Sequence, residues 1–236
     1  MLRKELLSKN KDIFVAAGKA LDQYAKKECK VLVVANPANT NCLVCAMNAP
    51  SIPRENFSAL TRLDMNRARS MIAAKLSKNV GQVKNVVIWG NHSSTQVPDA
   101  FIATVESEGK EVSVSSALEA DAETFLTTEF FKSVQGRGAA VIEKRGLSSA
   151  LSAANAIKDH IRDWVLGTSE EELVSMAVIS DGSYGVAKDI VFSFPVTCRG
   201  GKYSIVQGLT LHSRVKEAIK VTEKELLEEK EEALGH

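Results

Sequence analysis

The chain has 236 residues, of which 44% are hydrophobic and 25% are charged, and its 30 basic and 29 acidic residues give a formal net charge of +1. This composition is typical of a globular protein with a sizeable core, and the absence of a basic block argues against a nucleic-acid partner. Apolar runs are too short to span a membrane, and residues 1–9 lack the apolar stretch of a signal peptide. We therefore expect a cytoplasmic protein without a membrane partner.

The cysteines are too few for a disulfide framework: Cys29, Cys42, Cys45 and Cys198. Cys42 and Cys45 have the C-x-x-C spacing of a redox or metal half-site, but no second pair follows and no histidine is near in sequence. We expect them to be buried apolar residues and predict no metal site.

The first part of the chain alternates between helical and strand patterns. Helical spacing of apolar residues or unbroken β-branched runs predict, in order, a helix over 6–27, a strand over 29–37, a helix over 40–49, a strand over 57–61, a helix over 63–79 and a strand over 85–90. Strand runs this apolar are typical of parallel sheets buried on both faces. The order predicts a doubly wound α/β arrangement.

The second part has a different pattern. We expect paired strands and loops over 101–128, helices over 129–165, antiparallel strands with turns at Gly182 and Gly200–Gly201, and a closing helix over 215–234. A junction near 58–60 divides the chain into an α/β unit, residues 1–59, and an α+β domain, residues 60–236.

Two stretches carry side chains suited to acid–base chemistry. Asp64 and Arg67 lie three residues apart at the start of a predicted helix and so share one face, which by itself usually means a surface ion pair. His92 follows the glycine that ends a predicted buried strand, a common ligand edge in α/β folds, although a lone histidine there is more often structural. Together they suggest a carboxylate that orients an imidazole, beside an arginine that binds an acid.

The neighbouring polar residues allow other interpretations. Asn36 ends a predicted strand, where its amide could bind a hydroxyl or carbonyl, or could serve only as a turn residue before Pro37. Ser93 and Thr95 lie beside His92, but a G-x-S-x-G nucleophile elbow is missing, which disfavours a hydrolase. His160 is expected on a solvated helix face.

Several segments together resemble the malate dehydrogenases of the cytosolic type, within the lactate/malate dehydrogenase superfamily. VVANPANTN (33–41), LTRLDMNRA (60–68) and WGNHSSTQVPD (89–99) are similar, in the same order, to the family's substrate-site segments. SSALSAANAI (148–157) and VSMAVISDGSYGV (174–186) are similar to its second domain. The resemblance implies the C-terminal half of a Rossmann-type parallel sheet followed by an α+β catalytic domain, NAD as cofactor, malate and oxaloacetate as substrates, and a homodimer.

The resemblance also implies roles for individual residues. His92 is similar to the acid/base of the family, Asp64 to the carboxylate that orients it, and Arg67 to the arginine that binds the substrate carboxylate. The other correspondences are to substrate-binding positions, Asn36 and Arg3, and to cofactor-binding positions, Asn10, Val34, Ala35 and Asn36. A further cofactor position of the family, commonly glutamine, is Ala17 here.

One expected feature is missing from the sequence. It contains no G-x-G-x-x-G turn, which in this family holds the pyrophosphate of the cofactor. We therefore expect weak NAD binding, little turnover by the isolated chain, and an exposed sheet edge at residues 30–36. The alternative to an enzyme is an N-terminally truncated, inactive isoform that at most associates with a full-length subunit.

Overall fold

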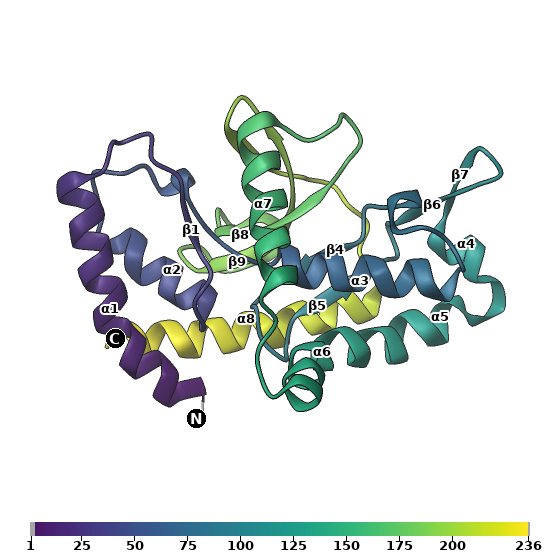
Figure 1. The fold of residues 1–236 in the computed structure, drawn as a ribbon, viewed down its shortest axis with the longest axis horizontal. Coiled ribbons are helices and arrows are strands. Elements are labelled where there is room, and N and C mark those ends of the chain that lie inside the picture. The colour runs from purple at the N-terminus through teal and green to yellow at the C-terminus, as the bar shows by residue number, and fades with distance from the viewer. Residues whose placement is uncertain (1–2, 236) are drawn as a thin grey trace.

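The fold is taken from a computed structural model that describes the backbone of residues 3–235 and the side chains of residues 10–235 (Figure 1). The α-helices are α1 (Arg3–Tyr24), α2 (Ala38–Met47), α3 (Arg62–Lys75), α4 (Val114–Leu118), α5 (Ala122–Thr124), α6 (Phe130–Arg145), α7 (Leu151–Leu166) and α8 (Ser213–Leu234). The strands are β1 (Val31–Val33), β2 (Phe57–Ala59), β3 (Val83–Lys84), β4 (Val87–Trp89), β5 (Val97–Asp99), β6 (Thr104–Ser107), β7 (Lys110–Ser113), β8 (Val174–Ile179), β9 (Val191–Arg199) and β10 (Lys202–Ile205).

The main sheet has five strands in the order β1-β2-β8-β9-β10. β1 and β2 are parallel, with Leu32 opposite Ser58, whereas β2 is antiparallel to β8, with Ala59 opposite Ala177. The chain therefore has the predicted α/β fold, with one sheet joining strands from both parts of the sequence. The predicted division at residue 59 stays a prediction.

The prediction of a third parallel strand at residues 85–90 is wrong. β4 pairs antiparallel with β5, with Ile88 opposite Pro98, and packs against β8 and β9. Among the described residues, backbone pairing with the main sheet is limited to a bridge between Gly90, directly after β4, and Ser193. The place beside β2 that a third parallel strand would occupy is taken by β8. β4 is apolar because all three of its residues are buried. A strand can be buried in this way in an antiparallel pair inside a core as well as in a parallel sheet.

β1 is the first strand of the five-stranded sheet and so lies at its edge, in agreement with the expected edge at residues 30–36. The prediction that its strand is buried on both faces is wrong, because Val31 and Leu32 are half-buried and Val34 is 40% exposed. Helices α1 and α2 pack beside it, with Phe14 and Leu21 against the small core around Phe57 (Figure 1).

The segment over 114–128, expected as strands and loops, is largely helical. Ser113 caps α4 by accepting a hydrogen bond from the Ser116 amide at 3.0 Å. Val114, Leu118 and Leu126 then face the main core, so that helical packing prevails over the strand pattern of the preceding residues.

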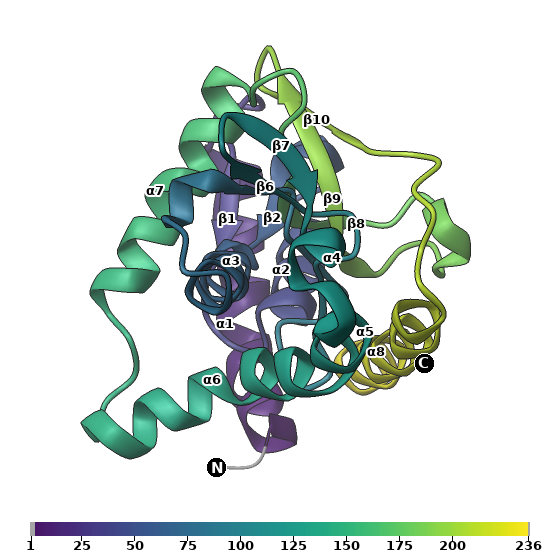
Figure 2. The same ribbon diagram turned by 90° about the vertical axis from the view of Figure 1, so that its right-hand side faces the viewer.

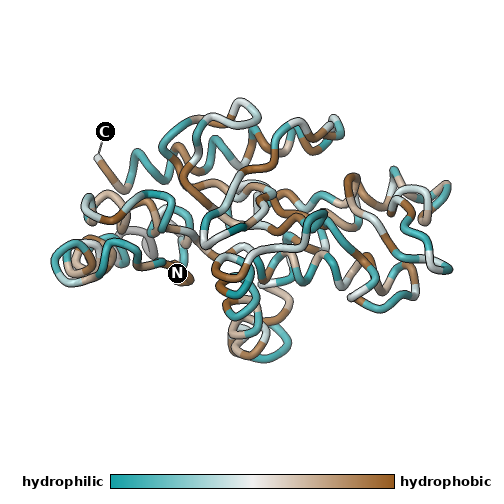
Figure 3. The backbone as a smooth tube through the Cα atoms, turned by 90° about the horizontal axis from the view of Figure 1, so that it is seen from above, coloured by the Kyte–Doolittle hydropathy of each residue, from teal (hydrophilic) through white to brown (hydrophobic). Residues whose placement is uncertain are grey.

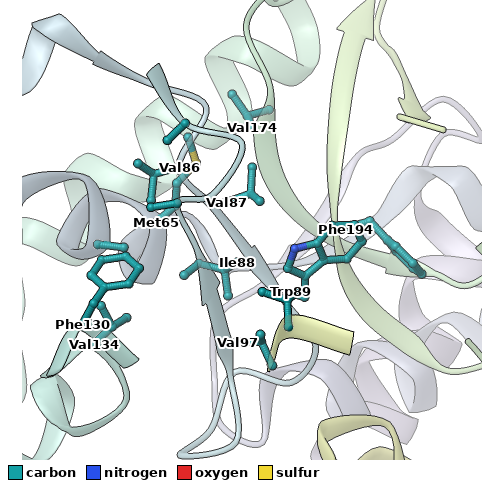
Figure 4. Close-up of a cluster of buried hydrophobic side chains, with 14 of the residues drawn as sticks. Met65, Val86, Val87, Ile88, Trp89, Val97, Phe130, Val134, Val174 and Phe194 are labelled. Atoms are coloured by element: carbon teal, nitrogen blue, oxygen red, sulfur yellow. The ribbon is translucent and has the colours of Figure 1, made fainter. Parts of the chain in front are cut away.

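The main core fixes β4 in place. Trp89 is fully buried, packs edge-on against Tyr184 with ring centroids 4.8 Å apart, and donates its indole N–H to Asp99 at 3.1 Å. Figure 4 shows Trp89 beside Phe194 of β9, with Val87 and Ile88 in the same cluster. The loop that follows β4 therefore starts from a rigid position.

Helix α8 runs along one side of the molecule from the region of α5 to α1 and α2 (Figure 1), and α7 lies on the opposite flank (Figure 2). Hydrophilic and hydrophobic residues alternate along these outer helices (Figure 3), as expected when one face packs inward. Within residues 3–235, no helix combines the length and apolarity needed to cross a membrane.

Candidate active site

The centre of the site is a pair of side chains from two separate elements. Asp64 lies in the first turn of α3 and is 1% exposed, and its carboxylate hydrogen-bonds Nδ1 of His92, whose side chain is 21% exposed. A carboxylate in the first turn of a helix is stabilised by the helix dipole. Because Asp64 accepts at Nδ1, it favours the tautomer with the proton on that nitrogen and stabilises the protonated ring.

The His92 backbone is held by a buried amide. The Asn39 side chain is fully buried, and its Oδ1 accepts the His92 N–H at 3.0 Å. Its Nδ2 donates to the carbonyls of Gly90 and Val191 at 3.2 and 2.9 Å. One side chain thereby fixes both ends of the turn that presents the imidazole.

Gly90 is required where the chain leaves β4. Its φ is +90°, a region that favours glycine, and a Cβ there would lie 2.2 Å from Cγ2 of Thr222 on α8. This close contact explains why the apolar strand stops at a glycine immediately before the histidine loop.

Arg67 lies next to Asp64 and lines an open pocket. Its Nη1 is 3.6 Å from Oδ1 of Asp64, and Nη2 donates to Ser149 at 3.4 Å. Burial lowers the pKa of the Arg67 guanidinium, Asp64 opposes this shift, and Arg137 adds to it. The pocket has a volume of about 390 Å³ and is lined by Leu63, Asn66, Arg67, Ser70, Met71, Ala74, Arg137, Ser152 and Asn155.

The predicted cofactor residues lie at the end of β1. Val34, Ala35 and Asn36 are exposed, and Nδ2 of Asn10 on α1 donates to the Asn36 carbonyl at 2.7 Å. Asn39, three residues after Asn36, joins this segment to the His92 loop. The structure thus brings together Asn10, the 34–36 segment, His92, Asp64 and Arg67, but the side chain of Arg3 lies outside the described residues.

Besides Asn39, the sequence interpretation missed two further residues of the site. Gln96 donates to Oδ1 of Asp64 at 3.4 Å, and Gln135 of α6 donates to the Gln96 carbonyl at 2.8 Å. Asn39 and Gln96 both lie inside the segments that suggested the family, so their position beside Asn36 and His92 was an available signal. Gln135 had no such signal.

The remaining polar candidates take no direct part in this arrangement. Ser93 and Thr95 donate to Glu225. Cys42 and Cys45 are buried as expected, and burial raises the pKa of both thiols, that of Cys45 to about 11. Among residues whose side chains are described, no cluster of three His, Cys, Asp or Glu side chains could hold a metal ion.

The prediction of a solvated His160 is wrong. The side chain is 1% exposed and packs edge-on against Trp164, with ring centroids 5.8 Å apart. Burial, assisted by Arg62, lowers the pKa of His160 to about 3. This histidine is therefore a neutral core residue at physiological pH.

Comparison with known proteins assigns the chain to one family over almost its whole length. Residues 1–58 match the NAD binding domain of lactate/malate dehydrogenase, and residues 61–235 match the alpha/beta C-terminal domain of lactate/malate dehydrogenase. The chain is 57% identical to the cytoplasmic malate dehydrogenases of Rattus norvegicus and Homo sapiens over 234 residues, which are 99% of this chain and 70% of each relative.

Solved structures agree with the sequence relatives. A malate dehydrogenase from Naegleria fowleri has a TM-score of 0.91 and 44% identity, with 100% of this chain and 70% of that one covered. A lactate dehydrogenase from Trichomonas vaginalis, in complex with NADH and oxamate, has a TM-score of 0.94 and 38% identity, with 100% and 71% covered. The chain belongs to the lactate/malate dehydrogenase family.

Proposed function

We propose that this chain is a malate dehydrogenase, which catalyses the reversible NAD-dependent oxidation of (S)-malate to oxaloacetate. The observation that carries the proposal is the hydrogen bond between Nδ1 of His92 and the buried Asp64 carboxylate, with the Arg67 guanidinium on the other oxygen of the same carboxylate. The relatives named malate dehydrogenase support the choice of substrate.

His92 is the acid/base in this proposal. Since Nδ1 is bound to Asp64, Nε2 is the nitrogen that exchanges a proton with the substrate. In the oxidation, Nε2 takes the proton of the malate C2 hydroxyl, and Asp64 stabilises the imidazolium that forms. In the reverse direction the imidazolium returns this proton to the carbonyl oxygen of oxaloacetate.

Arg67 positions the substrate. Its planar guanidinium can bind a carboxylate through two parallel hydrogen bonds, and it lines the open pocket beside Asp64. Its Ser149 contact and the Asp64 carboxylate restrict the guanidinium to one orientation. Asn36 supplies an amide for the substrate oxygen, and Arg3 is proposed as a second substrate-binding cation.

Bound NAD would supply the acceptor for the hydride that leaves C2 of malate. The exposed residues Val34–Asn36 at the end of β1 would lie against the nicotinamide ring. Their carbonyls at Ala35 and Asn36 accept from Asn41 and Asn10 at 3.0 and 2.7 Å, which holds the segment in place.

The assembly and location are also proposals. The relatives named cytoplasmic support a cytoplasmic enzyme. We propose a homodimer or a complex with a full-length subunit, and we propose no nucleic-acid or membrane partner. The alternative of an inactive isoform is not favoured over the enzyme by any of the comparisons.

The experiment is an NADH oxidation assay with oxaloacetate, extended to millimolar NADH, with pyruvate as the competing substrate. We expect slow turnover with oxaloacetate at high NADH concentration, in preference to pyruvate, and loss of that turnover in His92→Asn. Absence of oxaloacetate-dependent NADH oxidation, a preference for pyruvate, or an active His92→Asn enzyme would each contradict the proposal.

A further inference from the structure

A polar stripe on helix α8 lies against the His92 loop. Thr222, Glu225 and Glu229 are three and then four residues apart, so they share one face of the helix. Thr222 is fully buried and Glu229 is 8% exposed, although this helix otherwise buries apolar residues such as Leu226. Polar groups in such a position need partners, and they find them in the loop and in α2.

Glu225 collects hydrogen bonds from both sides of His92. Its Oε2 accepts from Nδ2 of Asn91 at 2.8 Å, from the Ser93 hydroxyl at 2.5 Å and from the Thr95 hydroxyl at 2.6 Å. All these donors are neutral, and among the described residues no basic side chain forms an ion pair with Glu225. Hydrogen bonds to an ionised acceptor are stronger than those between neutral groups, so a single oxygen holds the loop firmly.

The two neighbours in the stripe extend the contact. The Thr222 hydroxyl accepts the Asn91 N–H at 2.9 Å and lies 2.8 Å from the Thr95 hydroxyl, to which it can donate its own proton. Glu229 accepts from Asn91 at 3.2 Å and from Thr40 of α2 at 2.5 Å. The stripe therefore ties the His92 loop to α2.

This connection has a geometric consequence for the reaction. α2 begins at Ala38, two residues after Asn36, and carries Asn39, which holds the His92 main chain. The proton-transfer group and the predicted nicotinamide segment are thus both joined to α2, the first through Asn39 and the second through the chain itself. Proton and hydride transfer require fixed separations between reacting groups, and small displacements cost rate.

We propose that Glu225 is a positioning residue of the active site: it holds residues 91–95 so that the His92 imidazole stays on the Asp64 carboxylate. The consequence for catalysis rests on the function proposed above, but the effect on the imidazole does not. If Glu225 only anchored the loop, its replacement would leave the hydrogen bond between His92 and Asp64 unchanged.

The first test observes the imidazole directly. In ¹⁵N-labelled protein, the proton on Nδ1 of His92 is assigned by its loss in His92→Asn, and its chemical shift and solvent exchange are followed. We expect Glu225→Ala to move this signal and speed its exchange, and we expect Glu225→Gln, which keeps an acceptor oxygen, to restore it in part. The control is Glu228→Ala, which removes only an exposed ion pair with Lys224 on the same helix.

A second variant covers the case in which Glu225→Ala does not fold. Ser93→Ala removes one of the three donors to Glu225 and leaves Glu225 in place. We expect it to change the His92 signal in the same direction as Glu225→Ala, but by less. A His92 signal that is identical to wild type in Glu225→Ala, or in Ser93→Ala if the former is unfolded, overturns the proposal.

Turnover provides the second readout. We expect Glu225→Ala to lower kcat by about tenfold to a hundredfold with little change in KM for oxaloacetate, because the imidazole is displaced while Arg67 is not. A kcat equal to wild type in an active enzyme also overturns the positioning role. A wild-type protein without turnover, whose His92 signal still depends on Glu225, contradicts the proposed function and leaves the positioning role standing.

Discussion

Asp64 on α3 hydrogen-bonds Nδ1 of His92 in the loop after β4, although 28 residues separate them in sequence. The carboxylate is 1% exposed, and its other oxygen faces Arg67 and Gln96. Asp64 therefore has contacts to a base, a cation and an amide at once. This arrangement gives the carboxylate two separate effects on the imidazole, through orientation and through charge.

Replacing Asp64 with asparagine tests both effects. An amide cannot stabilise the imidazolium by charge, and its NH₂ group can donate to Nδ1 and favour the wrong tautomer. We expect kcat to fall by about 10²–10⁴-fold, the usual range for general acid–base catalysis, and by less than in His92→Asn. Steady-state rates with oxaloacetate measure the change. A kcat close to wild type would remove Asp64 from its proposed role.

This pair illustrates how far a sequence can be interpreted. Asp64, Arg67 and His92 occur in segments specific enough to suggest that they meet, and they do meet. The reason given for the position of His92, the end of a parallel strand, is wrong, because β4 is paired with β5 instead. An unbroken apolar run reports burial, and burial does not specify the direction of the neighbouring strand.

Arg67 should be sensitive even to a conservative change. Lysine keeps the charge but cannot form two parallel hydrogen bonds with a carboxylate. Loss of one hydrogen bond between charged groups costs about 1.5–3 kcal/mol, so we expect Arg67→Lys to raise KM for oxaloacetate by about tenfold to a hundredfold. Arg137→Lys is the matched control, since Arg137 lines the same pocket without an ion pair to Asp64. Equal effects of the two changes would argue against a substrate contact by Arg67.

Because β1 lies at the edge of the main sheet, its backbone amides should be less protected from hydrogen exchange than those of the central strands. β1 has β2 as its only neighbour among the described strands, whereas β8 lies between β2 and β9. Amides on an open edge lack ladder partners. We expect residues 31–34 to exchange hydrogen for deuterium faster than residues 174–179 in dilute protein, measured by mass spectrometry. Equal protection at all protein concentrations would show that the outer edge of β1 is covered.

The parts of the molecule that the sequence interpretation missed depend on distant packing. Glu225 is more than a hundred residues from the His92 loop that it contacts, and no local pattern distinguishes it from the exposed Glu228 on the same helix. His160 likewise was expected to be solvated because it lies on a helix near the charged Arg162. Only the way α7 packs beside Arg62 buries it.

The buried His160 should make the free energy of unfolding depend on pH. Its pKa is lowered from 6.5 to about 3 by burial and by Arg62, so the unfolded chain takes up a proton on falling pH where the folded chain does not. Above pH 6.5 both states are neutral and the full stability is present. Between these two values the free energy of unfolding falls by about 1.4 kcal/mol per pH unit through this one group, and the loss is complete below the folded pKa.

Replacing His160 with glutamine isolates this effect from those of other titrating groups. Glutamine has a similar size but does not titrate, so it removes the difference in proton uptake. We expect the stability difference between wild type and His160→Gln, measured by urea unfolding, to be constant above about pH 7 and to shift in favour of the variant as the pH falls below 6. A difference that stays constant down to pH 4 would mean that His160 binds a proton in the folded protein as readily as in the unfolded chain, and therefore that water reaches its ring.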